Sequence, residues 1–368
     1  MATAVKESRL RELSALGQSI WLDYIDRAMV RGGGLRAMIE EDGLSGVTSN
    51  PAIFEKAITG HRDYDEDIDR YLDEGRGAAE IYRLLTVADI QEAADVLRPV
   101  YDHTDGRDGY VSLEVSPHLA RDARGTVQEG RELWKAVGRP NLFVKIPATR
   151  EGLVAIRQCI GEGMNVNVTL LFGLERYRQV IEAYLSGLED RAAKGQGLVR
   201  VASVASFFLS RIDTMLDPEI DAMTDSRARG VRGRLAVACA KEAYQIYKGA
   251  FGGERFAGLA PLDARPQRLL WASTGTKDPK YSDVKYVESL IGPDTVNTLP
   301  PETLAAFRDH GRPEASLEKG VAEAREALRL AGELGIRLEE AARKLEEEGI
   351  EKFNKPYDAV MEAIRKRE

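Results

Sequence analysis

Short apolar runs alternate with longer segments of helical period along most of the chain, a pattern typical of repeated β-α units and a parallel sheet. Eight runs are predicted to be strands, and eight fit a closed barrel better than an open sheet. They cover residues 19–23, 46–49, 109–114, 142–146, 165–169, 200–205, 269–273 and 295–297. The intervals 51–108 and 206–268 are too long for a single helix, so each is predicted to carry extra helices.

The sequence becomes strongly helical and charged from about Pro313. Helices are expected over 315–330, 337–348 and 357–367, with residues 349–356 separating the last two. Because no internal repeat, low-complexity tract or flexible linker is present, one domain over residues 1–368 is the simplest organisation. We therefore predict an α/β fold, a (β/α)8 TIM barrel with additional helices, in which residues 313–368 form a helical C-terminal extension packed on the barrel. The last helix could cover the barrel mouth or only its side.

Polar and apolar residues alternate within four of the predicted strands, at 19–23, 110–115, 142–146 and 165–170. Successive strand side chains point to opposite faces, and the apolar set of a parallel barrel must meet the surrounding helices. The polar set then points inward, where it is costly unless paired or functional. Each set ends in a reactive residue at the carboxyl end of its strand, where barrel enzymes place their chemistry; these residues are Asp23, Glu114, Lys145 and Thr169.

Lys145 stands in the apolar stretch 142–147, which argues against the solvated position that most lysines occupy. Burial disfavours a charged ammonium, so a lysine in such a setting offers a neutral amine. That amine is the nucleophile required for a Schiff base with a carbonyl substrate. The structural alternative is a buried ion pair with Glu114 or Asp23, which is compatible with catalysis.

Charge and cysteine usage limit the classes of partner. The net charge of −8 disfavours nucleic acid, although a small phosphorylated substrate needs only one or two local cations. Cys159 and Cys239 lack metal-ligand spacing and are expected to be buried thiols in a reducing compartment. The four histidines are scattered, so no metal site is predicted. Residues 1–8 lack a signal-peptide core and no segment reaches the length of a membrane helix, so a cytoplasmic protein without a membrane partner is expected.

Six segments of the chain form a further pattern, in this order: GVTSNP (46–51), NLFVKIPAT (141–149), NVNVTLLF (165–172), SVASFFLSRID (203–213), WASTGTKDP (271–279) and DTVNTLP (294–300). Together they resemble the transaldolase family. The resemblance runs from about Ile20 to Pro301, and the helical tail is similar to that of the longer bacterial members.

This resemblance implies a transferase of the non-oxidative pentose phosphate pathway. Such an enzyme moves a dihydroxyacetone unit from sedoheptulose 7-phosphate to glyceraldehyde 3-phosphate, giving erythrose 4-phosphate and fructose 6-phosphate. The resemblance implies no metal and no organic cofactor. In agreement, the chain has neither a Walker loop nor a strand-linked GxGxxG. A monomer or a homodimer is expected.

At the matching positions, the resemblance implies a role for each reactive residue. Lys145 would form the imine, and Asp23 would be the general base for carbon–carbon cleavage. Glu114 and Thr169 would hold a water that shuttles protons during formation and dehydration of the carbinolamine.

The substrate-binding residues implied by the resemblance form two groups. Asn50 and Asn167 would bind the hydroxyls of the three-carbon unit, with Ser273 as a weaker candidate. Arg211 and Ser206 would bind the phosphate, assisted by a helix expected to begin near Ser206. The structural alternatives are hydrogen bonding of loop backbone at the strand ends by Asn50 and Asn167, and a helix-surface position for Arg211.

The chain departs from the family pattern at the phosphate site. Shorter members carry an arginine after Ala-Ser in the seventh-strand motif, whereas this chain has Ala-Ser-Thr-Gly-Thr-Lys at 272–277. Lys277 is the candidate for the missing charge.

Three rival interpretations remain open at the level of sequence. An aldolase with the same barrel would use the same residues and release free dihydroxyacetone. A pyridoxal-phosphate enzyme would also use a lysine imine and a phosphate site. A non-catalytic barrel kept for binding or assembly would need no inward reactive residues.

Overall fold

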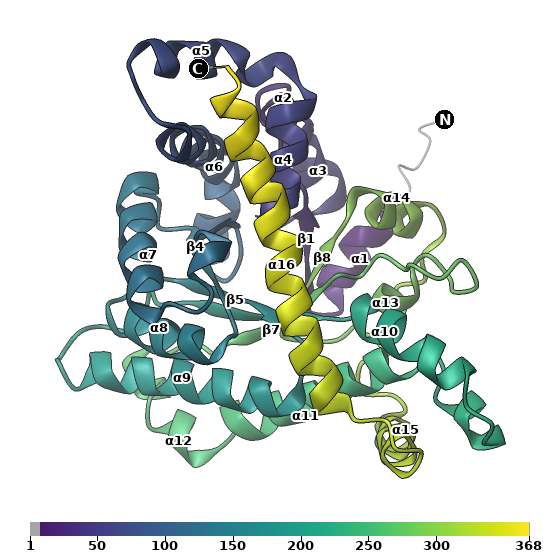
Figure 1. The fold of residues 1–368 in the computed structure, drawn as a ribbon. Coiled ribbons are helices and arrows are strands. Elements are labelled where there is room, and N and C mark those ends of the chain that lie inside the picture. Colours follow the sequence, from purple (N-terminus) through teal and green to yellow (C-terminus); the bar gives the residue numbers. More distant parts are fainter. Residues whose placement is uncertain (1–7, 368) are drawn as a thin grey trace, which may run out of the picture.

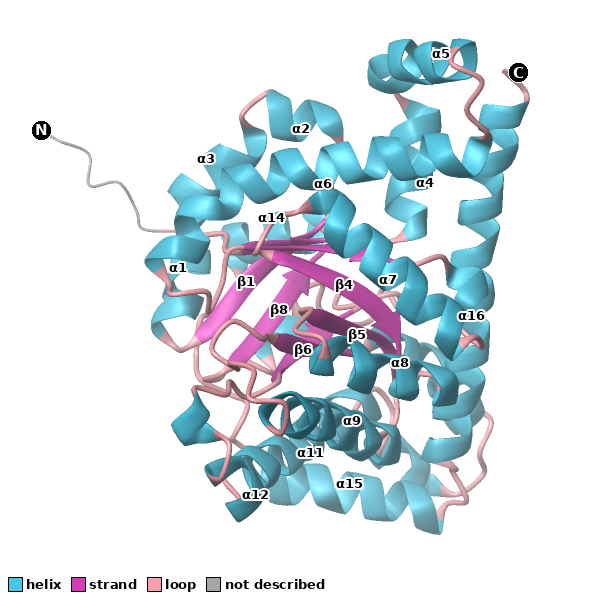
Figure 2. Cartoon of the chain, turned by 90° about the vertical axis from the view of Figure 1, so that its left-hand side faces the viewer, coloured by secondary structure: helices cyan, strands magenta, loops and turns pink. Residues whose placement is uncertain are grey.

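Eight parallel strands close into a barrel in which each strand pairs with its neighbours in chain order. The computed structural model describes residues 8–367. The expectation that residues 1–8 lack a signal-peptide core therefore lies outside the described residues, except at residue 8. Helices surround the strands on all sides (Figure 2). The strands are β1 Gln18–Asp23, β2 Gly46–Thr48, β3 Tyr110–Glu114, β4 Leu142–Pro147, β5 Val166–Leu171, β6 Ser203–Phe208, β7 Arg268–Ala272 and β8 Thr295–Leu299.

The predicted α/β barrel is therefore confirmed, and each predicted strand overlaps an observed one. The largest error is at β6, which begins at Ser203 rather than at residue 200. Ladder pairing starts with Val166 opposite Ser203, while the backbone N–H of the preceding Ala202 is bound by the side chain of Asn165. Apolar residues run through this whole segment, so its composition does not mark where pairing begins.

Both long intervals carry extra helices, as predicted. The first holds α4 Pro51–Gly60, η1 Arg62–Tyr64, α5 Asp65–Asp73 and α6 Ala78–His103. The second holds α10 Ser210–Asp221, η3 Ser226–Gly230, α11 Leu235–Phe251, α12 Glu254–Ala257 and η4 Ala260–Leu262. The remaining helices before the tail are α1 Arg9–Ala15, α2 Arg27–Arg31, α3 Gly34–Asp42, η2 Pro117–Leu119, α7 Ala123–Val137, α8 Arg150–Gly161, α9 Leu174–Ala192, α13 Lys285–Glu288 and α14 Pro301–His310. Of the helices within residues 8–367, none combines the length and the apolar character needed to cross a membrane.

The tail differs from the prediction at two points. Its first helix, α15 (Val321–Glu333), begins later than residue 315 because the backbone N–H of Ser316 is held by the carbonyl of Ile291, before β8. The expected break at residues 349–356 is absent, since α16 runs without interruption from Leu338 to Arg365 with Pro356 inside it. An interior proline costs a helix roughly 3 kcal/mol.

Burial of apolar side chains on both sides of that proline offsets the cost. The buried residues of α16 are Ala342, Leu345, Gly349, Ile350, Phe353, Val360, Met361 and Ile364. The helix contacts α4, α6, α10, β5 and η2. Figure 1 shows it in yellow, crossing the molecule from α15 to α5.

The amino-terminal end of the barrel is closed by a buried polar network. The Arg268 guanidinium donates to Asp108 Oδ1 at 3.0 Å and to Ser19 Oγ at 2.8 Å. Asp108 also accepts from the Ser19 hydroxyl at 2.7 Å and from Trp21 Nε1 at 3.1 Å. Gly46 is required beside this network, because a Cβ there would lie 2.4 Å from an atom of the Trp21 ring. This network forms the floor of the barrel interior, and the carboxyl ends of the strands are left for chemistry.

Candidate active site

Lys145 is buried inside the barrel, as predicted, with 5% of its surface exposed. Its Nζ donates to the carbonyl of Ser49 at 2.8 Å and lies 3.8 Å from Oε2 of Glu114. Strand register explains this proximity, because Glu114 of β3 is paired with Lys145 of β4, which is in turn paired with Asn167 of β5. Paired residues of neighbouring strands point to the same face, so three polar side chains line up across the barrel interior.

The Glu114 carboxyl has an environment that favours its protonated form. Its side chain is 7% exposed, and Oε2 accepts no hydrogen bond from the described residues. Burial raises the pKa of Glu114 from 4.5 to about 7, while the charge of Lys145 acts in the opposite direction and that of Asp23 raises it further. A carboxyl with a pKa near neutrality can both accept and donate a proton under physiological conditions.

Asp23 ends β1 at the same end of the barrel. Its Oδ1 accepts a hydrogen bond of 2.7 Å from the hydroxyl of Thr48, which also meets the hydroxyl of Thr298 at 2.7 Å. Burial raises the pKa of the Asp23 carboxyl, and the charge of Lys145 and the Thr48 hydrogen bond both lower it. The carboxyl is thus positioned by β2 and β8 and is suited to taking up a proton.

Asp23 and Lys145 line one cavity of about 140 Å³ at the carboxyl ends of the strands. Seven of the predicted site residues belong to its lining: Asp23, Asn50, Lys145, Ser206, Arg211, Ser273 and Lys277. Its other lining residues are Thr48, Phe208, Ala272, Gly275, Thr298, Pro300 and Phe353. The structure therefore brings together residues that are far apart in the sequence.

Three predicted residues lie in the barrel interior outside this lining. Glu114 faces Lys145 as described above. Asn167 donates from Nδ2 to the Ser112 hydroxyl at 3.0 Å and accepts from the Ser206 hydroxyl at 2.6 Å. Thr169 is fully buried, and its hydroxyl has no hydrogen-bond partner among the described residues.

The expectation of a helix beginning near Ser206 is wrong. Ser206 lies within β6, and α10 begins at Ser210. The strand β6 ends at Phe208, three residues later than the predicted end at residue 205, so Ser206 belongs to the strand. Ser206 therefore contributes its hydroxyl, bound to Asn167, and no helix N-terminus.

Arg211 and Lys277 supply positive charge to the cavity. The Nη1 atom of Arg211 is buried and makes no hydrogen bond within residues 8–367, and the guanidinium lies 5.6 Å from the centre of the Phe208 ring. Burial lowers the pKa of Arg211, with opposing contributions from Glu348 and Asp23. Lys277 is exposed in the loop after β7. An arginine with an unused donor and a nearby lysine can bind an anion.

The side chains of Asn50 and Ser273 also make hydrogen bonds that stabilise the fold. Asn50 is the N-cap of α4, and its Oδ1 accepts from the backbone N–H of Ile53 at 3.1 Å. This oxygen therefore does bind backbone, as the structural alternative holds, although the side chain also lines the cavity. Ser273 has a left-handed backbone (φ 54°), and its hydroxyl meets that of Ser210 at 2.8 Å, which ties the end of β7 to the start of α10.

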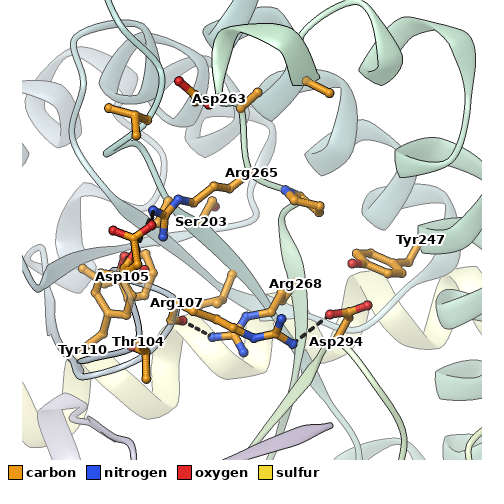
Figure 3. A pocket seen from close by; sticks show the side chains of 18 residues that line it. Thr104, Asp105, Arg107, Tyr110, Ser203, Tyr247, Asp263, Arg265, Arg268 and Asp294 are labelled. Carbon is orange, nitrogen blue, oxygen red and sulfur yellow. Dashed lines mark hydrogen bonds and ion pairs between the residues drawn. The ribbon is translucent and has the colours of Figure 1, made fainter. Parts of the chain in front are cut away.

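A larger cavity of about 500 Å³ lies at the opposite end of the barrel (Figure 3). Its arginines are occupied by partners: Arg107 pairs with Asp294 at 2.8 Å, and Arg268 with Asp108 at 3.0 Å. Among the described residues, its lining contains no lysine. The smaller cavity around Lys145 is therefore the candidate active site despite its size.

Comparison with known proteins agrees with this geometry. The sequence model of the family described as Transaldolase/Fructose-6-phosphate aldolase matches residues 20–364. The chain is 48% identical to the transaldolase of Thiobacillus denitrificans, over 96% of this chain and 99% of that protein. It is 46% identical to the transaldolase of Saccharopolyspora erythraea and 45% identical to that of Trichodesmium erythraeum, with at least 97% of each chain covered. This chain belongs to the transaldolase family.

Membership in the transaldolase family makes the chain an enzyme of the transferase class, and it favours transfer over the aldolase and non-catalytic alternatives. Both cysteines are free and buried, as predicted. Across residues 8–367, no group of three or more His, Cys, Asp or Glu side chains could hold a metal ion.

Seven lining residues were not among the predicted site residues, and they include Thr48, Thr298 and Phe353. Thr48 follows the apolar Val47 in β2, so the alternation that identified the other inward residues could have found it, whereas Thr298 follows the polar Asn297 in β8 and no alternation marks it. Phe353 belongs to α16, and its sequence carries no sign of a position in the cavity. Only packing of the tail on the transaldolase barrel brings it there.

Proposed function

We propose that this chain transfers a dihydroxyacetone unit from sedoheptulose 7-phosphate to glyceraldehyde 3-phosphate through a Schiff base on Lys145, in the non-oxidative pentose phosphate pathway. The main support is the buried Nζ of Lys145, which lies 3.8 Å from Glu114 and shares a cavity with Asp23 and Arg211. A nucleophile, a carboxyl and a cation in one cavity, with a second carboxyl 3.8 Å from the nucleophile, suit a phosphorylated ketose.

Imine formation involves Lys145, Glu114 and Thr169. The amine attacks the ketose carbonyl, and the resulting carbinolamine loses water. Both steps need proton transfer, for which Glu114 is suited because its pKa is about 7. The buried hydroxyl of Thr169, without a hydrogen-bond partner among the described residues, holds the water that carries the proton.

Carbon–carbon cleavage involves Asp23. This carboxylate takes the proton of the C4 hydroxyl, the C3–C4 bond breaks, and the bonding electrons pass to the protonated imine nitrogen. The first aldehyde leaves, and the three-carbon unit stays on Lys145 as an enamine. Attack on the second aldehyde reverses these steps, with Asp23 returning the proton to the new hydroxyl.

Substrate recognition is divided between two groups of residues. Arg211 binds the phosphate with the Nη1 donor that no described residue uses, and Lys277 and Ser206 assist. Asn50, Asn167 and Ser273 bind the hydroxyls of the retained three-carbon unit. A planar guanidinium suits the bidentate recognition of phosphate oxygens.

The remaining features of the proposal concern organisation. The chain acts as one domain in which residues 313–368 form an extension packed on the barrel, as the contacts of α16 support. It works in the cytoplasm as a monomer or homodimer, without a cofactor.

Borohydride trapping tests the proposal. The protein is treated with sodium borohydride in the presence of fructose 6-phosphate, and the modified peptide is identified by mass spectrometry. We expect a reduced three-carbon adduct on Lys145 in the native protein and none in Lys145→Met, which removes the amine and keeps similar bulk. An adduct on another lysine, or no adduct, would overturn the proposal.

A further inference from the structure

The side chain of Phe353 reaches the catalytic cavity from the C-terminal tail. Phe353 is 5% exposed and lines the cavity together with Lys145 and Asp23. It belongs to α16, which contacts β5 and the helices α4 and α10 that follow β2 and β6. Figure 1 shows this helix passing across the strands of the barrel. The tail therefore forms one wall of the site.

The amino-terminal half of α16 is fixed to α9. Glu339 accepts from the backbone N–H of Glu175 at 3.2 Å, at the start of α9, and Glu346 lies 3.4 Å from the guanidinium of Arg176. The Arg176–Glu346 pair is mostly buried, with 22% and 16% of the side chains exposed. These contacts hold the helix just before it reaches the cavity.

Close packing continues at the cavity itself. Gly349 is buried against Leu170 of β5, and a Cβ at this position would lie 2.9 Å from Leu170 Cδ2 and 3.7 Å from Arg211 Nη1. Glycine weakens a helix interior by about 1 kcal/mol relative to alanine. Its presence here allows α16 to approach the barrel mouth, one turn before Phe353.

The carboxyl-terminal half is fixed on the other side of the mouth. The ring of Tyr357 meets that of Tyr82 on α6 edge to face, with 5.1 Å between their centres. His118 in η2 lies 2.7 Å from the carboxylate of Asp358. Phe353 is thus held between two anchored halves of one helix.

We infer that Phe353 is a specificity-determining residue, which covers the enamine on Lys145 and favours attack on an aldehyde over protonation by water. This inference rests on the proposed function. Most side chains of the cavity are polar or charged, so water would otherwise occupy the space beside the reacting carbon. The aromatic ring of Phe353 places apolar surface in that space and excludes water from it, as closed active sites do to suppress side reactions.

The two fates of the enamine differ in one bond. In transfer, the enamine carbon forms a bond to the carbonyl carbon of the acceptor, whose oxygen takes a proton from Asp23. In release, the same carbon takes a proton that reaches it through water. In both cases water then adds to the imine and the Lys145 amine is regenerated; transfer yields a new ketose phosphate, and release yields free dihydroxyacetone.

The test compares the two fates in one preparation. Fructose 6-phosphate is supplied without an acceptor to measure release of dihydroxyacetone, and with erythrose 4-phosphate to measure transfer. For Phe353→Ala we expect the ratio of release to transfer to rise about tenfold or more, with a smaller rise for Phe353→Leu. Because misfolded molecules lower both rates equally, the ratio reports only on the site.

Leu345→Ala is the matched control, since Leu345 is 2% exposed on the same helix and lies outside the cavity lining. An unchanged ratio in Phe353→Ala would overturn the inference, and so would an equal rise in Leu345→Ala, which would indicate general loosening of α16. Should Phe353→Ala fail to fold, the ratio in Phe353→Leu decides by the same criteria. If borohydride traps no adduct on Lys145 of the native protein, the proposed function is wrong as well. If the adduct forms and the ratio of release to transfer is unchanged in Phe353→Ala, only the role of Phe353 is wrong.

Discussion

The Nζ atom of Lys145 lies 3.8 Å from Oε2 of Glu114, and both side chains are more than nine-tenths buried at the ends of adjacent strands. At this separation the lysine charge lowers the pKa of the carboxyl, yet burial is the larger effect and the pKa remains about 7. Proximity to an amine and a pKa near neutrality are the two properties needed to shuttle protons during imine chemistry.

Glu114 makes the stability of the protein depend on pH. Its pKa is about 7 in the folded state and near 4.5 in an unfolded chain, so the folded state holds the proton over this interval. The contribution of protonated Glu114 to the stability of the folded state is fully present below pH 4.5. It is lost as pH rises to about 7, so the free energy of unfolding falls across this range. Urea denaturation at a series of pH values should show a smaller fall in Glu114→Gln. The exposed Glu351→Gln is the control, and equal slopes in all three proteins would contradict the prediction.

Asp23→Asn should separate imine formation from cleavage. The amide cannot accept the C4 hydroxyl proton, so we expect kcat to fall about 10²- to 10⁴-fold. Lys145 remains intact, and borohydride should then trap the whole six-carbon substrate instead of a three-carbon fragment. The adduct mass decides: a three-carbon adduct formed at the native rate would exclude Asp23 as the base.

Arg211→Gln should weaken recognition of the phosphate. A hydrogen bond to a charged group contributes about 1.5–3 kcal/mol, so we expect kcat/KM for fructose 6-phosphate to fall roughly 10- to 150-fold. Activity with unphosphorylated fructose should change little. Arg124→Gln, which alters an exposed arginine of α7, should leave both substrates unaffected. An equal loss for both sugars would show that Arg211 supports the fold and not the phosphate.

Lys277→Ala tests the replacement for the arginine absent from the seventh-strand motif. Because Lys277 is exposed, we expect the KM for phosphorylated substrates to rise only about 2- to 10-fold, with kcat nearly unchanged. Lys280→Ala is the control from the same loop, since Lys280 does not line the cavity. Unchanged Michaelis constants in Lys277→Ala would remove this lysine from the phosphate site.

Asp108→Ala should destabilise the barrel floor. The substitution leaves the Arg268 guanidinium buried without its carboxylate, which typically costs about 3–5 kcal/mol. Arg107→Ala breaks only the half-exposed pair with Asp294 and should cost about 1 kcal/mol or less. Urea denaturation measures both. A similar decrease in the free energy of unfolding in the two variants would mean that the buried network does not stabilise this end of the barrel.

Much of the fold and site could be predicted from periodicity. Alternation within single strands placed Asp23, Glu114, Lys145 and Thr169 on inward faces, because side-chain direction in a strand is a local property. The β-α repeat made their strands parallel, so their carboxyl ends had to meet at one end of the barrel. The catalytic roles assigned to these residues stay predictions until the experiments above are made.

Errors arose where distant contacts compete with local preference. The break predicted at Pro356 is absent because buried side chains on both sides of it are packed on the barrel. The helix predicted from residue 315 starts later because Ser316 is bound to Ile291. The start of β6 was misplaced because pairing with β5, and not composition, determines it.

The sequence alone therefore determined the barrel, the inward lysine and the polar strand ends, since each follows from a repeat of two residues or from the alternation of strands and helices. Only the tertiary structure decided which residues meet in the cavity. Phe353 is more than 200 positions from Lys145 in the sequence, and no local pattern relates them. Their meeting depends on the packing of α16 over the barrel mouth, a long-range interaction that no local periodicity encodes.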